Sequence, residues 1–148
     1  MKIFSHAIEL PGRTRSEAWG ALARLARTPE LVVAGLEKSE VAEFTDRDGV
    51  LWLKRTKDFG GGMRIEDSVC LIPETRLEIH VAAGENWPRS WEEIELEETP
   101  RGVKLSFSYG QEKPQQLDSP RYAELRNEAY RNKDRALADL VEGLLAAA

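Results

Sequence analysis

The sequence has little cysteine and no long apolar run, and both features narrow what the protein can be. Cys70 is the only cysteine among 148 residues, so no disulfide can form within the chain, and a reducing compartment is expected. No stretch approaches the roughly 18 consecutive apolar residues of a membrane-spanning helix. The opening residues 1–6 are too short and too polar for a secretion signal. We therefore expect a cytoplasmic protein without a membrane span.

The sequence also has no concentration of positive charge. Its net charge is −5, with lysine and arginine scattered along the chain, which argues against nucleic acid as a partner. There is no internal repeat, low-complexity tract or linker. The length suffices for one hydrophobic core, so we expect residues 1–148 to form a single domain.

The order of helix and strand signals predicts an α+β fold. Residues 2–10 alternate as a strand, and residues 14–17 have the spacing of a capping box that begins a helix. A second short helix is expected from Thr28. Six strands separated by turn signals follow between residues 36 and 111. Ser119 is a good N-cap for one long helix that runs to the end of the sequence.

The pairing of the six strands can be predicted from their apolar residues. Neighbouring antiparallel strands pair residues whose numbers add to a constant, and keeping apolar residues on one face fixes that constant. The predicted pairs include Glu40 with Arg55, Arg55 with Asp67, Val69 with Val81, Ile79 with Ile94, and Glu92 with Tyr109. All five hairpins agree on one inner face, which predicts a single curved sheet.

The predicted inner face is apolar at one end and polar at the other. The apolar end carries Phe44, Leu51, Leu71, Leu77, Leu96 and Leu105. The polar end carries Glu40, Arg55, Asp67, Ser90, Glu92 and Tyr109. The final helix has bulky residues at its ends and a thin middle at Ala129, Asn132 and Ala136. A helix of this kind can roof a cavity, with Tyr122 and Arg126 above the polar end.

Two stretches near the start resemble a known family. Residues 15–22, with Trp19 and Leu22, and residues 27–36, with Pro29, Glu30, Leu31, Val33 and Gly35, match its helix and the segment that follows. Thr28, Val32 and Ala34 replace the family's Asn, Phe and Pro. The chain thereby resembles the AtaL-like branch of the START and Bet v allergen superfamily, also called SRPBCC.

The resemblance implies a helix-grip fold. In that fold a seven-stranded curved antiparallel sheet surrounds a long C-terminal helix, and two short helices follow the first strand. The superfamily binds lipids, sterols and polyketides between sheet and helix, and some members are cyclases, dehydratases or hydrolases. Fold likeness alone does not assign an activity, and the branch supplies no catalytic residues to transfer. The expected ligand-binding residues are Leu53, Arg55, Asp67, Val69, Ile79, Val81, Glu92, Ile94, Phe107, Tyr109, Tyr122, Arg126 and Ala129.

The polar end of the inner face admits two interpretations. Arg55 could hold a carboxylate or phenolate at the end of an apolar ligand, and the carboxyl groups around it could serve acid–base chemistry. Alternatively, Glu40, Arg55 and Asp67 form a structural row of ion pairs. Glu92 opposite Tyr109 has the same two interpretations. His6 is interpreted as an inward histidine with a structural partner.

The opposite face carries a predicted row of Cys70, His80 and Glu93. This face is otherwise charged and implies no pocket or oxyanion donors, so we assign no catalytic, metal or cofactor site there. Trp52 and Trp91 on the same face indicate either a homodimer interface or ordinary partial burial.

Three functions therefore remain open. The first is the binding of a small hydrophobic or amphipathic molecule. The second is a polyketide cyclase- or hydrolase-like enzyme that uses the same pocket, with Asp67, Glu92 or Tyr109 as acid or base. The third is a ligand-free interaction protein. A cavity above about 300 Å³ favours the first two, whereas a core of normal packing density favours the third.

Overall fold

The predicted α+β order of elements is present in the computed structural model, which describes residues 1–85, 87–112 and 119–148. The elements are β1 (Lys2–Pro11), α1 (Arg15–Arg27), the 3₁₀ helix η1 (Pro29–Leu31), β2 (Lys38–Thr45), β3 (Leu51–Gly60), β4 (Met63–Ile72), β5 (Arg76–Val81), β6 (Ser90–Thr99), β7 (Gly102–Gln111) and α2 (Pro120–Ala146). The second short helix is only the three-residue η1, because so short a segment cannot offset the cost of helix nucleation.

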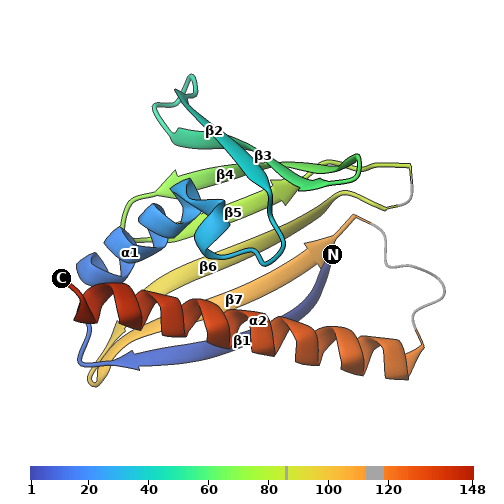
Figure 1. Ribbon diagram of the computed structural model, residues 1–148. Coiled ribbons are helices and arrows are strands. Elements are labelled where there is room, and N and C mark those ends of the chain that lie inside the picture. Colours follow the sequence, from blue (N-terminus) through green and yellow to red (C-terminus); the bar gives the residue numbers. More distant parts are fainter. Residues whose placement is uncertain (86, 113–118) are drawn as a thin grey trace.

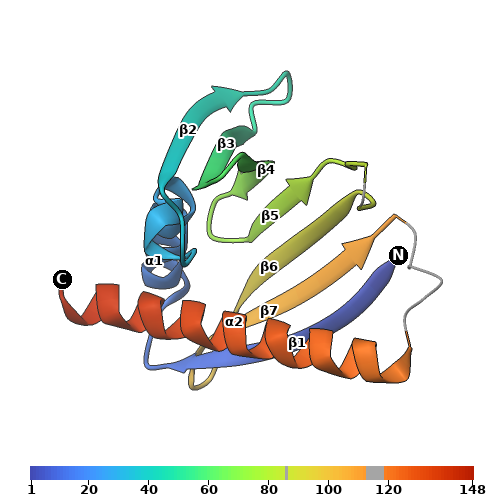
Figure 2. The same cartoon turned by 45° about the vertical axis from the view of Figure 1, so that its right-hand side comes forward.

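The seven strands form one antiparallel sheet in the order β1-β7-β6-β5-β4-β3-β2. Strands β2 to β7 follow one another as a meander, and β1 pairs with β7 at one edge. The sheet curves, and both helices lie on its concave side, with α2 running along β1 and β7 (Figures 1 and 2). None of the helices in the described ranges is long and apolar enough to cross a membrane.

Four of the five predicted hairpins keep the predicted inner face. Arg55 pairs with Asp67, and Glu92 pairs with Tyr109, as predicted. The pairings of β5 with β4 and with β6 are each shifted by two residues from the predicted ones, so Ile79 lies between Val69 and Glu92. Side chains alternate with a period of two, so this shift moves neighbours along the strand without turning any side chain to the other face.

The predicted pairing of β2 with β3 is wrong by one residue. Val41, not Glu40, pairs with Arg55, and Phe44 pairs with Trp52. A shift of one residue turns a strand over, so Phe44 lies 48% exposed on the outer face, stacked on Trp52. The hairpin turn explains the shift, because Asp46 Oδ1 accepts hydrogen bonds from the backbone N–H groups at positions 48 and 50.

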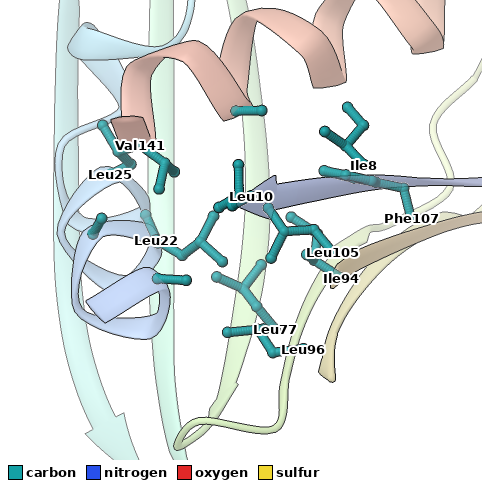
Figure 3. Packing of buried hydrophobic residues seen from close by; sticks show 14 of the residues in the cluster. Ile8, Leu10, Leu22, Leu25, Leu77, Ile94, Leu96, Leu105, Phe107 and Val141 are labelled. Carbon is teal, nitrogen blue, oxygen red and sulfur yellow. The ribbon is translucent and has the colours of Figure 1, made fainter. Parts of the chain in front are cut away.

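The hydrophobic core joins α1 and α2 to the apolar end of the sheet. Leu22 and Leu25 of α1 pack against strand residues that include Leu10, and Val141 of α2 closes the same cluster (Figure 3). The predicted capping box fixes the start of α1, since Thr14 and Glu17 exchange side chain–backbone hydrogen bonds of 3.1 and 3.0 Å.

Helix α2 buries its expected apolar stripe only in its C-terminal half, where Val141 is buried and Leu137, Leu140 and Leu144 pack against the core. Tyr122 and Ala129 are exposed, as are Asn132 and Ala136, whereas Asp134, Ala138 and Val141 are buried. The helix packs on β1 and α1, so it meets the body of the protein along the line of Asp134 and Val141. In the thin middle of α2, Ala129, Asn132 and Ala136 therefore roof no cavity within the described ranges, whereas Lys133 beside them lines one.

Candidate functional site

A cavity of about 250 Å³ lies between the concave face of the sheet, α1 and one side of α2. It is lined by Leu22, Leu25, Ala26, Pro29, Val32, Val33, Arg55, Lys57, Asp67, Leu77, Ile79, Val81, Glu92, Ile94, Lys133, Asp134 and Leu137. The roof comes from α1 and the segment up to residue 33, and α2 supplies a side wall. The cavity does not reach the volume above roughly 300 Å³ that was expected of a ligand pocket, so any ligand that it holds is smaller than a drug-sized molecule.

Six of the thirteen predicted ligand-binding residues line this cavity. They are Arg55, Asp67, Ile79, Val81, Glu92 and Ile94. Leu53, Val69 and Phe107 are fully buried in the core beside it, and Tyr109 is 5% exposed. Tyr122, Arg126 and Ala129 are absent from its lining, because α2 presents the face around Asp134 instead.

Arg55 and Asp67 form a buried ion pair on neighbouring strands. The Arg55 Nε and Nη2 groups donate to the two carboxylate oxygens of Asp67 at 2.7 Å each, and Nη1 donates to the backbone carbonyl of Ala26 at 3.0 Å. The Lys57 ammonium lies 2.9 Å from Asp67 Oδ2. The structure thus confirms the Arg55–Asp67 pair and ties it to the roof. Val41 takes the place expected for Glu40 opposite Arg55, and the second cation beside Asp67 is Lys57.

The positive charges of Arg55 and Lys57 keep Asp67 deprotonated. Burial alone would raise the pKa of this carboxyl group, but the hydrogen bonds and charge of Arg55, with the charge of Lys57, hold it below its ordinary value. Asp67 is therefore an anion at neutral pH. It is poorly suited to donate or accept a proton in a reaction.

A second buried cluster joins α2 to the sheet. Asp134 is fully buried, and the Tyr109 hydroxyl lies 2.6 and 2.7 Å from its two oxygens. His6 Nε2 donates to Asp134 Oδ2 at 2.6 Å. The interpretation of His6 as a histidine with a structural partner is thereby confirmed. The cluster fixes the angle at which α2 lies against β1 and β7.

Glu92 and Lys133 extend this cluster to the cavity. Lys133 Nζ lies 2.9 Å from Glu92 Oε2, and the Tyr109 hydroxyl is 3.3 Å from Glu92 Oε1. Burial, the charge of Glu92 and the hydrogen bond to Asp134 raise the pKa of Tyr109. Tyr109 therefore keeps its proton and acts as a donor only. Tyr130 stacks on its ring with centroids 3.8 Å apart.

Of the charged residues that line the cavity, sequence reasoning missed Lys57, Lys133 and Asp134. Lys57 follows Arg55 by two positions on β3, so strand alternation alone places it on the same face. Asp134 lies four residues after Tyr130 and seven before Val141, in the helical phase of the buried stripe. That signal was present, but a charged residue in such a stripe is recognisable only once its partners Tyr109 and His6 are known.

The predicted outer row of Cys70, His80 and Glu93 is not formed. Cys70 pairs with Glu78, and His80 pairs with Trp91, because β5 is shifted by two residues. The His80 ring instead bonds Glu78 at 3.0 Å. Burial raises the pKa of the Cys70 thiol, which makes it a weak nucleophile. Among the residues described, no group of three potential metal ligands comes together.

A second hollow, of about 350 Å³, lies on the other side of α1. Its lining includes Trp19, Arg27, Leu51 and Pro73, and Arg27 is paired with Glu43. Its one charged lining side chain already has a partner at the surface. The inner cavity is the better candidate, because several charged groups converge there on an apolar floor.

The sequence profile of the family described as acetylaranotin biosynthesis cluster protein L, or AtaL, matches residues 8–145. The chain belongs to the AtaL family. No curated protein sequence matches this AtaL-family chain. The resemblance in its first 36 residues is thus confirmed over nearly the whole length.

Solved structures show the fold that this AtaL-family chain shares. A START superfamily protein from Mycobacterium smegmatis has a TM-score of 0.66 at 14% identity, over 95% of this chain and 97% of that one. The Zhui aromatase/cyclase from Streptomyces sp. R1128 has a TM-score of 0.60 at 12% identity, over 97% and 92%. StfQ, a di-domain aromatase/cyclase of the steffimycin pathway, has a TM-score of 0.70 at 9% identity, over 97% and 50%.

Proposed function

We propose that this AtaL-family protein binds a small hydrophobic or amphipathic molecule in the cavity between the sheet, α1 and α2. One observation carries the proposal: an unfilled space of about 250 Å³ has an apolar floor and converging charged side chains. A core that served only stability would be packed to normal density. Likeness to START and aromatase/cyclase structures supports the proposal at the level of the fold.

The apolar part of the lining surrounds the space on two sides. Ile79, Val81 and Ile94 form the floor, while Leu25 and Pro29 form part of the roof. A bound molecule would remove these side chains and its own apolar surface from water, which is the main source of affinity in such pockets.

Native mass spectrometry of freshly purified protein tests the proposal. We expect a co-purified small molecule, seen as an added mass that disappears on denaturation. The variant Val81→Phe places a ring in the cavity and should lose that mass. Ala82→Phe, the next residue along and exposed, is the matched control and should keep it. Equal occupancy in both variants would place the ligand elsewhere.

The second candidate function is that of a polyketide cyclase- or hydrolase-like enzyme that uses the same cavity. The observation in its favour is the linked set of Glu92, Tyr109 and Asp134, of which Glu92 and Asp134 line the cavity. Of the three acid–base groups expected from the sequence, Asp67 is held as an anion and Tyr109 is held protonated. Turnover would therefore depend on Glu92. Loss of turnover in Glu92→Gln with ligand binding retained would favour the enzyme over the binding protein.

A further inference from the structure

The charged side chains of the cavity lie on two separate walls. One wall, on β3 and β4, has Arg55, Lys57 and Asp67. The other wall, on β6 and α2, has Glu92, Lys133 and Asp134. The apolar residues of β5 lie between them, because β5 separates β4 from β6 in the sheet.

The β3–β4 wall carries an excess of positive charge. Arg55 and Lys57 face a single carboxylate there, and the side chain of Lys57 is only 15% exposed. The opposite wall has two carboxyl groups and one ammonium, and that ammonium is already 2.9 Å from Glu92. An anion entering the cavity is therefore attracted to the first wall and repelled by the second.

Within the first wall, Lys57 is held by fewer protein contacts than Arg55. All three nitrogens of the Arg55 guanidinium donate a hydrogen bond, two to Asp67 and one to Ala26, so its position is fixed on two sides even though two of its five N–H groups remain. Lys57 has three N–H donors, and among residues 1–85, 87–112 and 119–148 its one ion-pair partner is Asp67. Its two remaining N–H groups have no acceptor among these residues and border the cavity, where water or the anionic group of a ligand can accept them.

We infer that the ligand is a small apolar acid whose anionic group lies against Lys57 and whose apolar body lies on Ile79 and Ile94. This inference rests on the proposed function of the cavity and adds the chemical class and the orientation of its ligand. Arg55 positions Asp67 and the roof, and Lys57 makes the direct contact. A charge-assisted hydrogen bond in a poorly hydrated site contributes more than a neutral one.

Two probes with the same apolar body test the inference. Isothermal titration calorimetry would compare 2-naphthoate with 2-naphthamide, which differ in charge but hardly in shape. We expect the wild type to bind naphthoate at least about tenfold more tightly. Lys57→Met keeps the length of the side chain and should remove that preference, while the affinity for naphthamide changes less than about twofold. Lys54→Met, on the exposed outer side of the same strand, should behave as wild type.

The outcomes separate this inference from the proposed function. Equal binding of both probes to the wild type would overturn the acid class and leave the cavity as a binding site. A naphthoate preference that survives in a folded Lys57→Met protein would overturn the role of Lys57. If neither probe bound the wild type, the inference would fail, while the proposed function would still be decided by the native mass spectrometry of wild type and Val81→Phe. The wild-type comparison needs no variant, so it holds even if Lys57→Met does not fold.

Discussion

At the scale of the residue, the decisive feature is the sharing of one carboxylate by two cations. Asp67 is fully buried as a side chain, and Arg55 and Lys57 both contact it. Moving such charges out of water is costly, and bidentate hydrogen bonds with good geometry offset that cost. Removing one partner leaves a buried charge uncompensated. This geometry favours a structural role for Arg55, and the proposed ligand contact is at Lys57.

Asp67→Asn should lower the free energy of unfolding by about 3–5 kcal/mol near neutral pH. Because the folded-state pKa of Asp67 lies below its unfolded value of about 3.9, its contribution is complete above that value and is lost as pH falls through the folded pKa. Urea unfolding from about pH 7 to about pH 3 should show the difference from wild type shrinking below about pH 5.

Glu66→Gln is the matched control for this titration. Glu66 is the neighbouring residue, exposed on the outer face, so its loss should change stability by less than about 0.5 kcal/mol. A deficit in Asp67→Asn that stayed constant with pH would contradict the assignment, since it would show that the carboxylate charge adds no stability.

At the scale of the element, helix α2 is held by buried polar contacts as well as by apolar ones. Its residues Ala138 and Val141 join the core, while Asp134 bonds β1 through His6 and β7 through Tyr109. Apolar packing tolerates rotation of a helix, but hydrogen bonds of 2.6 Å do not. These bonds explain why α2 presents Asp134 to the sheet and leaves Ala129 and Ala136 in solvent.

Tyr109→Phe should destabilise the protein by about 1.5–3 kcal/mol, because the Asp134 carboxylate loses one of its two close donors. Tyr130→Phe is the matched control. Tyr130 stacks on Tyr109, and within the described residues the Tyr130 hydroxyl makes no hydrogen bond. Removing this hydroxyl should lower the free energy of unfolding by less than about 0.5 kcal/mol. Urea unfolding measures both, and equal effects would contradict a hydrogen-bonded attachment of α2.

At the scale of the whole molecule, the outer face of the sheet is the surface through which a homodimer is predicted. Trp52 donates to Asp46 at 2.9 Å, and Trp91 packs over Gly110, so both tryptophans have contacts within their own chain. Phe44, on the same face, is 48% exposed. The homodimer stays a prediction, and Phe44 stacked on Trp52 would be its centre.

A homodimer through this face predicts a concentration-dependent increase in sedimentation coefficient. Phe44→Glu should weaken association at least about tenfold, because a carboxylate would be buried without a partner. Glu43→Gln, one residue away, should leave association unchanged. A single monomeric species at every concentration would contradict the interface and leave the tryptophans as partly buried residues of the outer face.

The sequence by itself determined the order of the elements, the helix caps and the inner face of β3 to β7. Those features follow from local signals: the capping box at Thr14, the N-cap at Ser119 and the alternation of apolar residues. It also determined the Arg55–Asp67 pair, because those residues lie on adjacent strands whose pairing is set by a short hairpin.

Only the tertiary structure decided the rest. The register of β2 against β3 depended on how Asp46 closes the turn between them. The shift of one residue from the predicted register turned Glu40 and Phe44 away from the inner face. The rotation of α2 depended on Tyr109 and His6, which lie more than twenty residues away in the sequence from Asp134. A repeating pattern specifies which side chains share a face, whereas contacts between distant elements specify which face meets the cavity.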